Sequence, residues 1–131
     1  MMMNPKRIDM DDKGDCFEAA GKLMMDLSMA GEDMSDVRLV HGEVTGEGPV
    51  EGIKFGHAWV EKLNELPEGF GKMEWVLDYS NGRKTEMPKV LYYCLGKIAA
   101  NTHFYTYPEM SSKCAEVANW GPWDLETESG L

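Results

Sequence analysis

Three residues of this chain carry the side chains of an activated cysteine nucleophile. Cys16, His57 and Asp78 follow one another along the sequence, each in a different short segment. In such a set the thiolate attacks a carbonyl carbon, the imidazole accepts and returns a proton, and the carboxylate orients the imidazole. The three residue types therefore predict acyl transfer through a thioester intermediate. They do not identify the substrate.

The nucleophile requires a helix, and the sequence predicts one from Cys16 to about Ala30. Asp15 is a suitable N-cap, and the apolar residues that follow recur at helical spacing. A thiol in the first turn lies beside amide dipoles that favour the thiolate form. The other two cysteines, Cys94 and Cys114, lie in apolar helical patterns and are predicted to be core residues.

The base and its orienting acid require neighbouring strands, which are predicted at 54–63 and 73–79. Trp59 lies two residues after His57 on the same predicted face, and we expect it to form a wall of the site and bind substrate. Glu61 is the other candidate for the orienting acid, but it lies about 13 Å along the strand from His57. Asp78 ends the next strand, within reach of the imidazole, and is the preferred partner.

Each residue also has an ordinary structural interpretation. Cys16 would most often be a buried core thiol, and His57 a half-buried strand histidine with a satisfied ring. Asp78 would begin the turn that Ser80-Asn81-Gly82 indicates. The hypothesis of a catalytic triad rests on the order of the three residues and on their occurrence in successive elements.

The remaining pattern predicts a single α+β domain with an antiparallel sheet and flanking helices. Residues 1–14 are expected to be an extended lead-in, 15–124 the globular core, and 125–131 a mobile acidic tail. Outside the site, the expected elements are a strand at 38–45, a helix from Pro88 to about Ala100, a strand at 103–107 and a helix at 108–118.

The composition of the chain limits the classes of binding partner and cofactor that we expect. The chain of 131 residues has 23 acidic against 13 basic residues, a net charge of −10, and is expected to bind neither nucleic acid nor membranes. Three cysteines form no disulfide framework, and the N-terminus lacks the apolar stretch of a signal peptide, so a cytoplasmic protein is expected. No Cys-x-x-Cys or His-x-x-x-His pair is present, and neither a metal nor another cofactor is predicted.

The segments around the three residues also resemble a known family. Asp-Cys-Phe-Glu-Ala-Ala, Arg-Leu-Val-His-Gly, Gly-His-Ala-Trp-Val-Glu and Trp-Val-Leu-Asp-Tyr-Ser, between Asp15 and Ser80, are similar to the transglutaminase-like branch of the papain-like cysteine hydrolases. The resemblance implies Cys16 as nucleophile, His57 as general base and Asp78 as orienting acid. The family's tryptophan after the nucleophile is replaced by Phe17, and no Gln or Asn stands close upstream as an oxyanion donor.

The resemblance implies a papain-like core and an amide or isopeptide bond in a protein or peptide-like substrate. The backbone N–H of Cys16 is then the only oxyanion donor that the sequence suggests. Phe-Tyr-Thr-Tyr-Pro-Glu and Asn-Trp-Gly-Pro-Trp-Asp, in the second half, resemble small proteins of phages and bacteria, which implies a phage-infected bacterial cell as one possible location. The alternative hypothesis is a non-catalytic acidic binding or inhibitor protein with the same fold.

Overall fold

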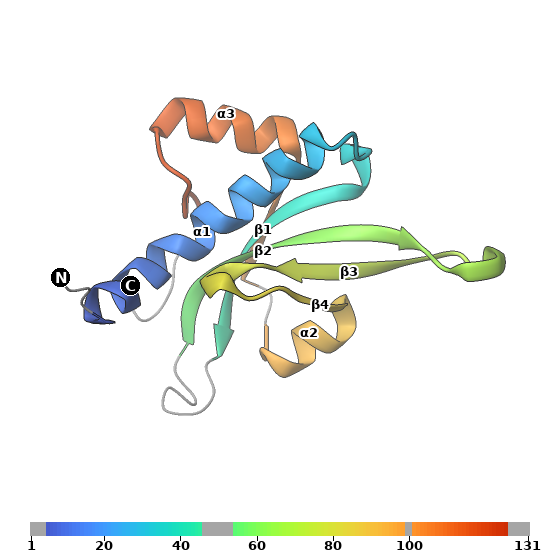
Figure 1. Cartoon of the computed structure of the whole chain (residues 1–131), viewed down its shortest axis with the longest axis horizontal. Coiled ribbons are helices and arrows are strands. Elements are labelled where there is room, and N and C mark those ends of the chain that lie inside the picture. The colour runs from blue at the N-terminus through green and yellow to red at the C-terminus, as the bar shows by residue number, and fades with distance from the viewer. Residues whose placement is uncertain (1–4, 46–53, 99–100, 126–131) are drawn as a thin grey trace.

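A five-stranded antiparallel sheet forms the centre of the molecule (Figure 1). The computed structural model describes residues 5–45, 54–98 and 101–125, with side chains from Cys16 onward except that of Asn81. The strand order is β4-β3-β2-β1-β5, and every neighbouring pair is antiparallel. The strands are β1 (Val37–Thr45), β2 (Lys54–Glu65), β3 (Lys72–Asp78), β4 (Thr85–Pro88) and β5 (Thr102–Tyr105).

Within the described ranges, three α-helices cover the two faces of this sheet. Helices α1 (Pro5–Met29) and α3 (Tyr107–Val117) lie on one face, and the shorter α2 (Lys89–Leu95) lies on the other (Figure 1). Helix α3 begins with a capping box between Thr106 and Glu109, which satisfies backbone donors of its first turn. The prediction of an α+β domain with an antiparallel sheet and flanking helices is confirmed.

Side chains that alternate along the strands divide the core in two. Leu39 and Val60 point toward α1, whereas Val40 and Trp59, one position away, point toward α2. The larger core lies under α1 and α3 and includes Cys16. The smaller core lies under α2.

The helix that carries Cys16 begins much earlier than predicted. It starts at Pro5, so the expected extended lead-in is wrong for residues 5–14, while residues 1–4 lie outside the described part. Proline is favourable at the first helical position, and no second proline follows within the helix. Gly14 costs about 1 kcal/mol relative to alanine, which does not end a helix that continues on both sides.

The larger of the other differences from the predictions concern β4, the end of α2 and Leu125. Strand β4 was not predicted, because Thr85–Pro88 is short and contains a charged residue and a proline; it is an edge strand, where proline is tolerated. Helix α2 ends at Leu95 rather than near Ala100, since the chain turns at Gly96. Leu125, assigned to the mobile tail, is buried in the larger core, and the rest of that tail lies outside the described residues.

No helix within the described ranges is long and apolar enough to cross a lipid bilayer.

Candidate active site

His57 and Asp78 form a hydrogen-bonded pair between β2 and β3. His57 Nε2 lies 2.8 Å from Asp78 Oδ2, and the two side chains are only 15% and 13% exposed. The β2–β3 pairing ends with Val60 opposite Leu77, so the next residue of β3 projects on the same face as His57. Strand register therefore places the imidazole and the carboxylate together, as the sequence predicted.

Four hydrogen bonds hold the Asp78 carboxylate. Besides the His57 contact, Oδ1 accepts bonds from the backbone N–H and the hydroxyl of Ser80 at 3.3 and 2.8 Å, and Oδ2 accepts one from the Tyr92 hydroxyl at 2.6 Å. Burial alone would raise the pKa of Asp78, but the bonds from His57, Tyr92 and Ser80 outweigh it and lower the pKa to about 2. The group is thus a fixed carboxylate at neutral pH.

Cys16 also interacts with the imidazole of His57. Burial would lower the pKa of His57, but hydrogen bonds with Asp78 and with Cys16 outweigh burial and raise it to about 10. Because Asp78 engages Nε2, the ring nitrogen left for the thiol is Nδ1. The structure therefore brings the three predicted residues, Cys16, His57 and Asp78, into one cluster, called the candidate triad below.

The triad forms at an edge of the sheet. Cys16 belongs to the core on the α1 face, whereas His57 alternates with Ala58 and points to the α2 side. Strand β3 has ended at Asp78, so within the described ranges the part of β2 around His57 pairs with β1 alone. The turn at Ser80–Gly82 packs against α1, and the interaction between Cys16 and His57 joins α1 to this part of β2.

One predicted property of Cys16 is wrong. The residue lies well inside α1, eleven positions after Pro5, rather than in the first turn. In a helix interior the backbone N–H bonds to the carbonyl four residues earlier, and the dipole effect is confined to the terminal turn. Neither the oxyanion donor nor the dipole support that the sequence suggested is available to Cys16.

Trp59 is a core residue and not an accessible wall of the site. Its side chain is completely buried, its ring packs 5.2 Å from that of Tyr92, and its indole N–H donates to Glu61 at 3.1 Å. A residue without exposed surface cannot contact a substrate, so the expected binding role is corrected. Trp59 instead supports His57, whose ring centre is 6.1 Å away.

Glu61, the competing orienting acid, is engaged elsewhere. Its carboxylate is 3% exposed and binds the Trp59 indole, the Tyr93 hydroxyl and the Lys89 ammonium, the last at 3.0 Å. The preference for Asp78 as the partner of His57 agrees with this geometry.

The sequence did not single out Tyr92, which the structure adds to the site. It donates to Asp78 and interacts electrostatically with Cys16, and burial and the nearby Asp78 charge raise its pKa far above the usual range. A Tyr-Tyr pair in an apolar helical pattern gives no sign of such a role. The role of Tyr92 becomes visible only in the structure, where α2 packs against β3 and brings the Tyr92 hydroxyl to Asp78.

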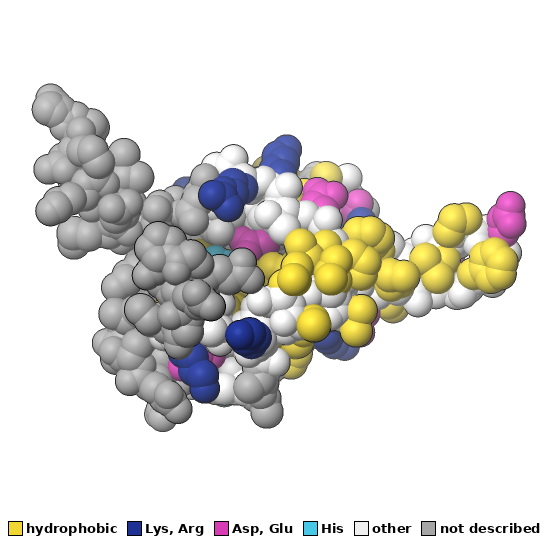
Figure 2. All heavy atoms as spheres, turned by 90° about the horizontal axis from the view of Figure 1, so that it is seen from below, with side chains coloured by type: hydrophobic (Ala, Val, Ile, Leu, Met, Phe, Trp, Pro, Cys, Tyr) yellow, Lys and Arg dark blue, Asp and Glu magenta, His cyan; other side chains and the backbone are white. Residues whose placement is uncertain are grey.

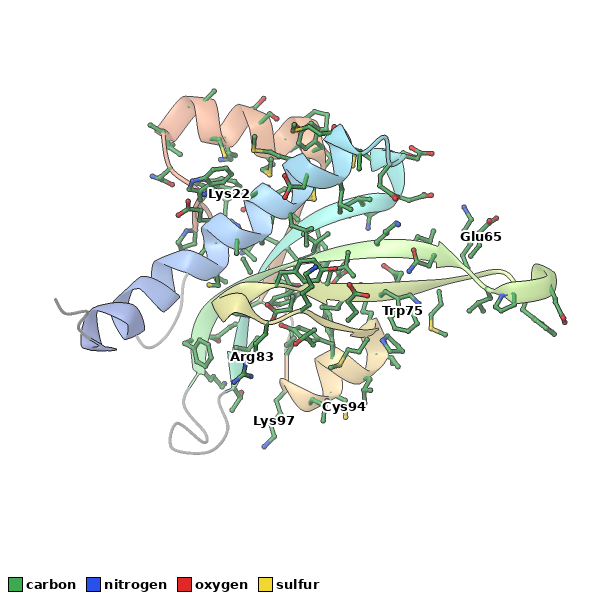
Figure 3. All side chains as sticks on the ribbon, in the orientation of Figure 1. Lys22, Glu65, Trp75, Arg83, Cys94 and Lys97 are labelled. Atoms are coloured by element: carbon green, nitrogen blue, oxygen red, sulfur yellow. The ribbon has the colours of Figure 1, made fainter. Side chains whose placement is uncertain are left out.

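Of the two remaining cysteines, Cys94 is not the core residue that was predicted, whereas Cys114 packs against the larger core. Cys94 is exposed on the side of α2 that faces away from the sheet (Figure 3), and Cys114 on α3 is partly exposed. Any measurement of Cys16 reactivity must therefore remove both thiols. Among the described residues, no group of three His, Cys, Asp or Glu side chains is placed to hold a metal ion.

Comparisons with protein-family models, with curated proteins and with solved structures find no match for this chain. The resemblance to transglutaminase-like hydrolases thus rests on the short segments around the triad.

Proposed function

We propose that this protein is a cysteine-dependent enzyme that transfers or hydrolyses acyl groups through a thioester, with an amide or isopeptide bond as substrate. The observation that carries the proposal is the imidazole of His57, which lies 2.8 Å from Asp78 and also interacts with Cys16. A positively charged imidazole beside a thiol favours the reactive thiolate. The fixed negative charge of Asp78 keeps that imidazole charged and oriented.

The chemistry would proceed in two steps. The Cys16 sulfur attacks the substrate carbonyl, the carbonyl electrons move to oxygen, and the collapsing intermediate expels the amine as His57 donates a proton to it. The resulting thioester is then attacked by water or by a second amine. The attacking group gives its proton to His57, and Cys16 leaves as the thiolate.

Alkylation with iodoacetamide tests this proposal in a Cys94→Ser, Cys114→Ser background, where Cys16 is the only thiol. An isolated thiol loses about tenfold in rate for each pH unit below its titration. We expect the rate at Cys16 to fall much less steeply between about pH 7 and about pH 5, and His57→Ala to restore the steep dependence. Asp78→Ala should have a smaller effect, because Asp78 orients the imidazole without contacting the sulfur.

One observation favours the second candidate, a non-catalytic binding protein. Cys16 is 4% exposed and lies inside a helix, which is the setting of a structural thiol. A Cys16 that resists alkylation in the folded protein at every pH, or whose rate is indifferent to His57, would contradict the enzyme and support this candidate.

A further inference from the structure

The hairpin of β2 and β3 extends beyond the body of the molecule as a two-stranded arm (Figure 1). Strand β3 pairs with β2 from Lys72 to Leu77, but β4 pairs only with Trp75–Asp78. Among the described residues, Lys72, Met73 and Glu74 therefore have a neighbouring strand on one side only. Their other edge presents backbone groups that can pair with a further strand.

An apolar surface adjoins this free edge. Phe70 at the tip of the arm is 75% exposed, Val90 at the start of α2 is 80% exposed, and Met73 between them is 36% exposed. Figure 2 shows hydrophobic side chains gathered over α2 and continuing onto the arm. A groove of about 670 Å³ lies between arm and helix, lined by Lys72, Met73, Glu74, Pro88, Lys89, Val90 and Tyr93.

We propose that a second copy of this chain pairs with the free edge of β3, antiparallel and about a twofold axis at Met73. In such a pairing Met73 faces its own equivalent, and Lys72 lies directly opposite Glu74 of the second copy. The twofold axis repeats the contact, so two Lys–Glu pairs flank one Met–Met contact. Opposite charges at directly facing positions stabilise antiparallel strands.

The charges on this edge fit a second copy. Lys72 and Glu74 side chains are 46% and 45% exposed, and their contacts within the chain are long, at 3.8 Å to Asp36 and 3.5 Å to Lys89. Both are therefore available to a facing strand. Two copies with a charge of −10 each repel one another, and reciprocal Lys–Glu contacts are the arrangement that opposes this repulsion at close range.

The same symmetry gives the exposed Phe70 a place to bind. It lies three residues before Met73, so its side chain would reach about 10 Å past the axis along the second copy. Pro88 of the second copy pairs with Trp75, two residues or about 7 Å past the axis, and so lies within reach of this side chain. In the second copy β4 occupies the edge of β3 from Trp75 onward. The tip of the first copy precedes the start of β3 at Lys72, so it need not form backbone pairs at that position. Each aromatic side chain would enter the other copy's groove.

Sedimentation equilibrium of the full chain tests the pairing through a charge swap. The wild type should form dimers, whereas Lys72→Glu and Glu74→Lys should each weaken association about tenfold, because each places like charges opposite one another twice. The double variant Lys72→Glu, Glu74→Lys should restore the wild-type affinity. Lys54→Glu, at the far end of β2, makes the same charge change away from the edge and should leave the affinity unchanged.

Phe70→Ser tests the groove independently and should also weaken the dimer. Circular dichroism checks that every variant is folded, and all the substituted side chains are exposed. A wild-type protein that stays monomeric at every concentration overturns the proposal. Dimers that persist in both single charge variants, or that the double variant fails to restore, overturn the register.

Discussion

The imidazole of the candidate triad should make the stability of the protein depend on alkaline pH. In the folded chain the pKa of His57 is raised to about 10, against 6.5 for an unperturbed histidine. A folded pKa above the unfolded one means that the folded state holds the proton more tightly. The stabilisation is therefore complete below about pH 6.5 and is lost as the pH rises toward about 10. One proton gives a maximal slope of about 1.4 kcal/mol for each pH unit.

Urea denaturation between about pH 6 and about pH 9 measures this slope as a difference between wild type and His57→Ala. The comparison is necessary because other groups also titrate in this range. We expect the wild type to lose its advantage over the variant steadily with rising pH, and a His103→Ala control to keep the wild-type slope. Parallel stability curves for wild type and His57→Ala would show that the folded protein does not retain a proton on His57, and the proposed ion pair with Asp78 would be refuted.

Three further predictions concern buried and half-buried side chains of the two cores. Tyr92→Phe and Tyr93→Phe each remove one hydroxyl bond to a carboxylate and should cost about 1 kcal/mol in urea unfolding, but only Tyr92→Phe should change the alkylation rate of the triad thiol. Burial and a nearby histidine lower the pKa of His41 to about 3, so the wild type should lose stability as the pH falls below about 6.5, and His41→Phe should reduce that loss in acid unfolding curves. Gly42→Ala would place a methyl group 2.6 Å from the Trp59 ring and should destabilise the fold by about 1–3 kcal/mol.

The sequence was a good guide to the sheet and to the His57–Asp78 pair. Alternating β-branched and aromatic residues predicted β1, β2 and β3, and adjacent antiparallel strands bring residues at their ends together. The His57–Asp78 contact could be predicted because it depends only on which strands are neighbours in the sheet. The pairing of β5 with β1, and the position of α2 on the second face, depend on contacts between distant segments, which local patterns do not specify.

Residues whose environment depends on packing were predicted poorly. The start of α1 was misplaced because Asp15 is a good N-cap in isolation, whereas the chain continues the helix back to Pro5. Trp59 was predicted to be accessible but is buried beneath α2. Cys94 was predicted to be a core residue but is exposed on the outer side of its helix. Periodicity predicts which side chains share one face of a helix or strand. Whether another element covers that face depends on the tertiary packing.

The residues of helix α2 are at most partly buried, so α2 should open locally more easily than the core helix α1. Segments with few buried apolar contacts open with a smaller free energy than the core, so the amides of α2 should exchange with solvent before those of α1. Tyr92 leaves with the helix when it opens, and the Asp78 carboxylate then loses one of its donors while the sheet remains intact. We therefore expect that local opening of α2 leaves the candidate triad in place, with its carboxylate held by one hydrogen bond fewer.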